Sequence, residues 1–234
     1  INKTTLSDIY NIYYADFIDT FNKYAVPDYL KNAFFIDGGA LAVENALKAA
    51  FDWKKRLNLQ KGISKEGDKI IYFNQAFHGR SGYTMTLTNT SDPRKTMYYP
   101  KFDWFKIDNP FLSFPLNDDI LKSVIDNENL AIHNIKNILK ENDNDIAALI
   151  IEPIQGEGGD NHFRNEFMIQ LKELCDSNNM LLIFDEVQTG IGITGKMWAH
   201  EHFTVKPDII SFGKKTQVCG MLAGDKLFSV DKNV

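Results

Sequence analysis

The stretch from Leu181 to Gly220 reads LLIFDEVQTGIGITGKMWAHEHFTVKPDIISFGKKTQVCG, and it decides the fold class of the chain. Its first apolar run, 181–184, delivers a carboxylate, Asp185, and its second run, 209–212, is followed by an amine, Lys214. Short apolar runs bounded by polar, Gly-rich segments are typical of buried strands. The stretch therefore predicts two strands that present an acid and an amine at one edge of a sheet.

The segments before this stretch predict the rest of that sheet and the helices that cover it. Residues 146–151 form a continuous apolar run, which fits a strand buried on both faces. Between 40 and 56, apolar residues recur at the spacing of one helix face. The predicted fold class is α/β, with a mostly parallel central sheet flanked by helices. We also expect strands over 33–36 and 68–73, a packed irregular segment over 88–116, and helices over 7–24 (capped by Ser7 or Asp8), 121–139 (broken near 126–129) and 163–178.

The composition is that of an ordinary soluble globular protein, with 44% hydrophobic and 24% charged residues. The formal net charge of −5 argues against a nucleic-acid partner. No apolar run approaches the roughly 20 residues of a membrane span, and the first residues, INKTTLSDIY, do not read as a signal peptide. The two cysteines, Cys175 and Cys219, make no disulfide framework. We therefore expect a cytoplasmic protein with no membrane partner.

Asp185 and Lys214 are the two groups that pyridoxal phosphate needs from a protein. This cofactor forms a Schiff base with a lysine, and an acidic side chain holds its protonated ring nitrogen. Asp185 would keep the ring an electron sink, and Lys214 would then move a proton between the substrate carbon and the cofactor. Lys215, the next residue along the chain, is the rival nucleophile.

The order and spacing of these motifs resemble the class III, fold type I, family of pyridoxal phosphate-dependent aminotransferases. The family pattern is an apolar strand, DEVQTG-x-G-x-TG, then PDI, then a lysine five residues after the Ile. The chain gives DEVQTG at 185–190, TG at 194–195, PDI at 207–209 and then Lys214. Its GKKTQVCG, with FIDGGALAVENALKAAFDW upstream, resembles the members that act on the ε-amino group of L-lysine more than the family at large. The resemblance covers nearly the whole chain.

The resemblance assigns roles around the cofactor ring. It implies that Lys214 and Asp185 are the catalytic residues and that both bind the cofactor. Val187 matches the position behind the ring. Gln188 matches the position that donates a hydrogen bond to the phenolic oxygen of the ring. The spacing from PDI favours Lys214 over Lys215.

The resemblance also assigns residues to the phosphate and to the substrate. A Gly turn from a strand into a helix exposes free N–H groups that suit an anion. Gly39 and Ala40 match the phosphate-binding positions, with Ala40 where the family pattern has a hydroxyl. Phe77 matches the position over the outer face of the ring, and Arg80 matches the one that grips a substrate carboxylate through its planar fork. Glu157 matches the residue that faces the substrate and pairs with an arginine from the C-terminal part, beyond residue 234.

The implied activity is transfer of the ε-amino group of L-lysine to 2-oxoglutarate, a reaction of lysine degradation. The products are 2-aminoadipate 6-semialdehyde and glutamate. Arg80 would hold the α-carboxylate of lysine, and Glu157 would move between two partners to admit a one-acid and a two-acid substrate. Ornithine or another ω-amino acid is the alternative donor. A homodimer is expected for the full-length protein.

Residues 1–234 are expected to form the pyridoxal phosphate-binding large domain of a longer subunit. Against the family pattern, the N-terminal segment and the C-terminal small domain are absent. The missing part would supply the arginine for Glu157 and, from a neighbouring subunit, a hydroxyl for the phosphate. We therefore expect the 234-residue chain alone to bind the cofactor weakly and to show no transamination.

A P-loop ATPase is the distant alternative. Residues 181–186, LLIFDE, fit a Walker B strand, and 190–196, GIGITGK, fit G-x-x-x-x-G-K. Met197 stands where a Ser or Thr must reach Mg²⁺, however, and the acid precedes the loop, whereas a P-loop follows its own strand directly. No metal site is expected at His200 and His202, because a spacing of two places them on different faces of a helix.

Overall fold

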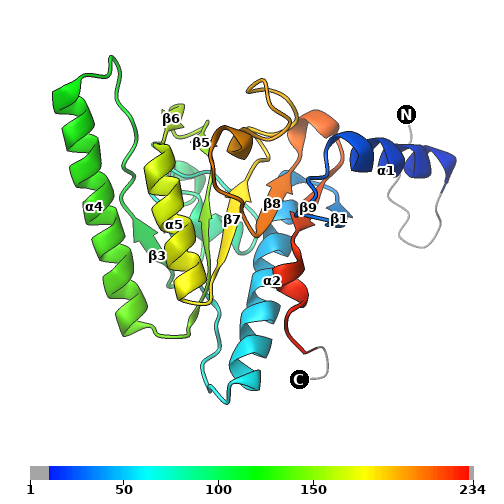
Figure 1. Ribbon diagram of the computed structural model, residues 1–234, viewed down its shortest axis with the longest axis horizontal. Coiled ribbons are helices and arrows are strands. Elements are labelled where there is room, and N and C mark those ends of the chain that lie inside the picture. The colour runs from blue at the N-terminus through cyan, green and yellow to red at the C-terminus, as the bar shows by residue number, and fades with distance from the viewer. Residues whose placement is uncertain (1–10, 232–234) are drawn as a thin grey trace.

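The computed structural model describes residues 11–231, which place a central sheet between two layers of helices (Figure 1). The sheet has seven strands, in the order β1 (Asn32–Ile36), β9 (Cys219–Ala223), β8 (Ile209–Phe212), β7 (Leu181–Asp185), β4 (Ile146–Ile151), β2 (Lys69–Phe73) and β3 (Phe105–Ile107). From β8 to β3 each strand runs parallel to its neighbour, whereas β9 and β1 are added antiparallel. The predicted α/β fold with a mostly parallel sheet is confirmed.

Different helices cover the two faces of the sheet. On one face lies α2 (Gly39–Gln60), and on the other lie α4 (Asp118–Glu141) and α5 (Asn165–Ser177) (Figure 1). Successive residues of a strand point to opposite faces. Ala148 and Ile150 accordingly join the core under α2, whereas Leu149 and Ile151 join the core under α5. This two-sided burial explains why β4 appears in the sequence as an unbroken apolar run.

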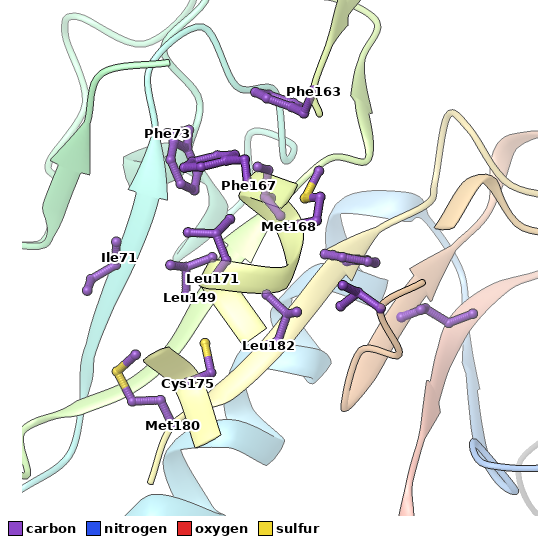
Figure 2. Packing of buried hydrophobic residues seen from close by; sticks show 14 of the residues in the cluster. Ile71, Phe73, Leu149, Phe163, Phe167, Met168, Leu171, Cys175, Met180 and Leu182 are labelled. Atoms are coloured by element: carbon purple, nitrogen blue, oxygen red, sulfur yellow. The ribbon is translucent and has the colours of Figure 1, made fainter. Parts of the chain in front are cut away.

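Figure 2 shows the core beneath α5. Phe167 and Leu171 point from α5 onto Phe73 and Leu149 of the sheet, and the rings of Phe73 and Phe167 meet edge to face with centroids 5.9 Å apart. Fully burying one such side chain contributes about 1.5–3 kcal/mol to folding. Close packing on this face therefore supports the strands whose carboxyl ends carry the loops.

The expected break in the helix over 121–139 is wrong. α4 is continuous from Asp118 to Glu141, and the side chain of Asn117 caps it by accepting a hydrogen bond from the Ile120 N–H at 2.9 Å. The polar run near 126–129 does not interrupt the helix, because its buried member, Glu128, forms an ion pair with Arg164 at 3.3 Å. The other three side chains of the run face solvent.

The first helix begins later than expected. α1 spans Ile12–Tyr24, and the side chain of Asn11 caps it by accepting from the Tyr14 N–H at 2.9 Å. Ser7 and Asp8, the expected caps, lie outside the described residues. The aromatic spacing nevertheless identified the buried face of the helix, because the ring of Phe21 of α1 packs against that of Phe212 of β8, with centroids 4.9 Å apart and a tilt of 33° between the rings.

Several short elements had no clear signal in the sequence. The segment 88–116, expected to be irregular, contains the edge strand β3. β9 was not predicted. The remaining elements are a two-stranded sheet of β5 (Ile154–Gln155) and β6 (Asn161–His162), a short helix α3 (Thr84–Leu87) and the 3₁₀ turns η1 (Pro93–Lys95), η2 (Ala199–His202), η3 (Lys214–Thr216) and η4 (Asp225–Phe228). Across residues 11–231, no helix combines the length and apolar character needed to cross a membrane.

Candidate active site

A pocket lies where β2, β4, β7 and β8 end, at the carboxyl edge of the sheet. Ligands of α/β proteins bind at this edge, because the loops that follow the strands converge there. The pocket holds about 340 Å³ of empty space, part of it open to solvent. The residues that line the pocket are Gly39, Ala40, Phe77, His78, Gly79, Glu152, Asp185, Val187, Gln188 and Lys214. They include every residue that the sequence analysis assigned to cofactor binding.

Asp185 is the buried acid of this pocket, with 4% of the residue exposed. Its Oδ1 accepts hydrogen bonds from the Val187 N–H at 3.0 Å and from the Ser211 hydroxyl at 2.9 Å. Its Oδ2 lies 2.8 Å from Nδ1 of His78. An ionised carboxylate can accept about four hydrogen bonds, two at each oxygen. The acceptor position that remains is therefore on Oδ2.

His78 is a site residue that the sequence analysis did not select. The side chain is buried, its backbone N–H donates to Oγ1 of Thr88 at 3.0 Å, and its Nδ1 faces Asp185. Because a carboxylate only accepts, the proton of a neutral His78 ring lies on Nδ1. Nε2 is buried and has no hydrogen-bond partner within residues 11–231. A polar ligand in the pocket would satisfy this atom.

Glu152 is a second acid of the pocket, and the sequence analysis assigned it no role. It directly follows β4, is 3% exposed, and accepts a hydrogen bond from the Phe77 N–H at 2.9 Å. Burial raises the pKa of Glu152 to about 7, and the negative charge of Asp185 acts in the same direction, whereas His78 opposes the rise. Glu152 therefore fixes the backbone at Phe77 and is partly protonated near neutral pH.

Glu152→Gln should change how the stability of the cofactor-free protein depends on pH. The pKa rises from an ordinary 4.5 to about 7 in the folded state, so folding favours the protonated acid. This contribution to stability is fully present below the unfolded pKa and is lost as the pH rises through the folded pKa. Between pH 4.5 and 8 the unmodified protein should lose on the order of 3 kcal/mol more than the variant.

Urea unfolding across this pH range measures that difference. Glu141→Gln, which changes an exposed carboxylate at the end of α4, is the control and should follow the unmodified protein. Parallel stability curves for the unmodified protein and Glu152→Gln would show that burial does not raise the pKa of Glu152.

Lys214 is the lysine that reaches the pocket. It begins η3, with one residue between it and the end of β8. Its backbone has a left-handed φ of 53°, and its Nζ donates to Oε1 of Gln188 at 2.6 Å. Lys215 points elsewhere: its Nζ contacts the backbone oxygen of Gln188, and it does not line the pocket. Burial, followed by the charge of Lys214, lowers the pKa of Lys215. Because Lys214 lines the pocket and Lys215 does not, the structure favours Lys214 over Lys215 as the nucleophile.

The start of α2 forms another wall of the pocket through Gly39 and Ala40. The first N–H groups of a helix have no partner within the helix, and they favour a bound anion. A Cβ on Gly39 would lie 2.6 Å from Cγ1 of Val187, and a Cβ on Gly79 would lie 2.5 Å from Cβ of Ala40. The close approach of these segments therefore requires glycine at both positions.

The two predicted substrate residues lie outside the lining of the pocket. Arg80 is exposed and directly follows Gly79, which does line it. Glu157 lies in the turn between β5 and β6 and forms an ion pair with Lys95 of η1. The sequence had suggested an arginine beyond residue 234 as its partner, and it gave no indication of Lys95.

The geometry excludes the P-loop alternative. A phosphate-binding loop of that type joins a strand to a helix whose first turn faces the phosphates. Residues 190–196 instead form turns that lead to the short η2, and Lys196 is exposed. Gly190 packs against Trp198, since a Cβ there would lie 2.7 Å from the indole ring.

Comparison with known proteins gives the family. Residues 4–229 match the sequence profile of the aminotransferase class-III family. The chain belongs to the class III aminotransferases. It is 48% identical to the L-lysine-epsilon aminotransferase of Mycobacterium tuberculosis strain H37Rv and 44% identical to that of Streptomyces clavuligerus, in each case over 235 residues. These alignments cover 100% of this chain and 51% of each relative, so the chain spans about half the length of the curated relatives it matches.

Solved structures of aminotransferases show the same fold. A structure of lysine aminotransferase from M. tuberculosis has a TM-score of 0.92 at 48% identity, with 97% of this chain and 52% of that chain covered. A transaminase from the marine bacterium Virgibacillus has a TM-score of 0.79 at 23% identity and supports the fold alone.

Class III aminotransferases use pyridoxal phosphate, and the pocket suits this cofactor. The remaining acceptor position on Oδ2 of Asp185 suits a protonated ring nitrogen. The start of α2 suits a phosphate, and Lys214 supplies the amine. The unpartnered Nε2 of His78 is an independent sign that a polar group belongs in the pocket.

Proposed function

We propose that the protein containing this chain transfers the ε-amino group of L-lysine to 2-oxoglutarate, giving 2-aminoadipate 6-semialdehyde and glutamate. The observation that supports this proposal is an acid and a lysine, Asp185 and Lys214, in one pocket of a chain 48% identical to L-lysine-epsilon aminotransferases. We also propose that the full-length protein is a cytoplasmic homodimer, as the family resemblance suggests.

Lys214 would carry the covalent and proton-transfer chemistry. When bound, pyridoxal phosphate supplies an aldehyde that captures amino groups and a ring that accepts the electron pair left by a departing proton. The Nζ of Lys214 would bind the cofactor covalently. A free Nζ would take the proton from the substrate carbon that bears the amine and pass it to the cofactor, and it would move a proton the opposite way in the second half-reaction. Gln188, which accepts from this Nζ, would orient it.

Asp185 would hold the protonated ring nitrogen through Oδ2. His78 and Ser211 occupy other acceptor positions of the carboxylate, so it cannot rotate without breaking both hydrogen bonds. A buried, oriented charge of this kind needs no rearrangement when the reaction occurs. His78 would thus act as a positioning residue for Asp185.

Other lining residues would hold the remaining parts of the cofactor. Gly39 and Ala40 would offer backbone N–H groups to the phosphate, which compensates for the missing hydroxyl at position 40. Phe77 and Val187 would offer aromatic and apolar surface to the ring. The Oε1 of Gln188 already accepts from Lys214, so the amide NH₂ is the group that could donate to the phenolic oxygen.

Arg80→Ala in the full-length protein tests the substrate assignment. Arg80 would bind the α-carboxylate of lysine and a carboxylate of 2-oxoglutarate, so its loss should raise the KM for both. One charge-assisted pair is worth about 1.5–3 kcal/mol, which corresponds to roughly ten- to a hundredfold. Arg56→Ala is the control, because Arg56 pairs with Asp52 on α2 and does not line the pocket. Unchanged kinetics would remove Arg80 from the substrate site.

A panel of amino donors tests the function itself. The full-length protein is supplied with 2-oxoglutarate and with lysine, ornithine or 4-aminobutyrate, and glutamate formation is measured. We expect the highest kcat/KM for lysine. Preference for 4-aminobutyrate would instead agree with the more distant relative from Emericella nidulans, a 4-aminobutyrate aminotransferase at 34% identity.

A further inference from the structure

The loop between β2 and α3 carries Arg80, and a hydrogen bond anchors the loop on each side of this residue. On one side, the backbone oxygen of Gly79 accepts from the hydroxyl of Thr88 at 2.6 Å. On the other side, the hydroxyl of Ser81 donates to Oε1 of Glu44 at 2.7 Å. Arg80 itself is exposed, so the backbone of the loop, rather than packing of the side chain, determines where its guanidinium can reach.

Glu44 joins this loop to α2. Its Oε1 also accepts from the backbone N–H groups of Tyr83 at 2.7 Å and Thr84 at 3.3 Å, where α3 begins. Ala40 lies one turn earlier on the same face of α2, and a Cβ on Gly79 would lie 2.5 Å from the Cβ of Ala40. α2 therefore holds the loop at two points, and its first turn lines the pocket.

We propose that Glu44 is a positioning residue that sets the place of the Arg80 guanidinium relative to the cofactor, and so the affinity for substrate carboxylates. This inference rests on the proposed function, in which Arg80 binds those carboxylates and the start of α2 binds the cofactor phosphate. One helix then holds both the phosphate and the loop, so it fixes the distance between the carboxylate site and the cofactor. Without the Glu44 carboxylate, two backbone N–H groups and a hydroxyl lose their acceptor, and the loop can move away from α2.

Glu44→Ala in the full-length enzyme tests the proposal. We expect the KM for lysine and the KM for 2-oxoglutarate to rise about fivefold, while kcat and the affinity for the cofactor stay within about twofold. Glu44→Gln keeps a side-chain oxygen that can accept from the same groups, so both KM values should stay within about twofold of the unmodified enzyme. In an Arg80→Ala background, Glu44→Ala should raise neither KM further, because the residue that it positions is gone.

Asp52→Ala is the matched control. Asp52 is an exposed carboxylate on the same helix, where it pairs with Arg56 at 2.9 Å, and its loss should leave both KM values unchanged. An equal rise in this control would replace the positioning role of Glu44 with a general effect of charge on α2. Unchanged KM values for Glu44→Ala, an equally large effect of Glu44→Gln, or additive effects in the double variant would also overturn the proposal.

Binding of an unreactive dicarboxylate separates this inference from the proposed function. Glutarate has the carbon chain of 2-oxoglutarate but no keto group, so it cannot be aminated. Calorimetry on the cofactor-loaded enzyme should show about fivefold weaker glutarate binding in Glu44→Ala, and no further loss when Glu44→Ala is added to Arg80→Ala. Binding that Arg80→Ala weakens and Glu44→Ala leaves intact would refute the role of Glu44 alone. Binding that neither variant weakens would refute both this role and the carboxylate site at Arg80, whatever amino donor the enzyme proves to use.

Discussion

Replacing Lys214 with alanine should lower the transamination rate of the full-length protein by about a thousandfold or more. The Nζ of Lys214 is the amine that lines the pocket, and both covalent attachment and proton transfer depend on it. Lys215→Ala is the matched control. It removes a neighbouring lysine whose Nζ contacts the backbone oxygen of Gln188, and its rate should stay within about threefold of the unmodified enzyme.

Borohydride reduction gives a second readout that does not depend on turnover. It should fix pyridoxal phosphate on the peptide that contains Lys214, and mass spectrometry of fragment ions should place the modification on that residue. A label on Lys215, or no label, would refute the assignment. Lys214→Ala protein should take up the cofactor without becoming labelled.

Asp185→Asn should lower the rate by roughly a hundred- to a thousandfold, as expected when an oriented charge partner is lost. Asparagine has almost the same shape, and its oxygen can still accept from Ser211. Its NH₂ group, however, would replace Oδ2 and face the Nδ1–H of His78. Both groups are hydrogen-bond donors, so the hydrogen bond between His78 and position 185 would be lost. The imidazole would have to move its proton to Nε2, and the neutral amide could no longer balance a positive ring nitrogen.

Asp208→Asn is the control for this experiment. Asp208 is also a buried carboxylate, but it precedes β8 at the opposite edge of the sheet, where it pairs with Lys172 at 2.9 Å. This variant should lose thermal stability and keep a normal rate per folded molecule. Asp185→Asn should instead lose its rate per folded molecule. Comparable activity losses in the two variants would mean that Asp185 matters only for folding.

The central strands were predictable because local chemistry alone determines them. A strand buried on both faces must be apolar throughout, and β4, β7 and β8 follow the expected limits within one residue. β9 and β3 depend instead on their partners. β9 is recognisable through its antiparallel registers with β8 and β1, and the edge strand β3 has only three residues, which pair with β2. No periodicity can develop over so few residues.

Site residues could be predicted where the chemistry of the residue type itself defines the role. Site residues were missed where the role depends on a contact with a residue far away in the sequence. Lys214 and Asp185 could be selected for their chemistry before the fold was known. His78 matters because it meets Asp185, which lies 107 positions away. The Lys95–Glu157 ion pair likewise joins two ordinary surface residue types. Such pairings arise only when the chain folds.

The left-handed backbone at Lys214 sets catalytic activity against thermal stability, because the residue that the reaction needs is strained at this position. A non-glycine residue in this region costs about 1–2 kcal/mol, which glycine at position 214 would avoid. Selection of variants for thermal tolerance alone would therefore favour loss of this lysine. An engineering campaign on this scaffold should screen every round for turnover and keep position 214 out of its libraries, because the most stable sequence there is an inactive one.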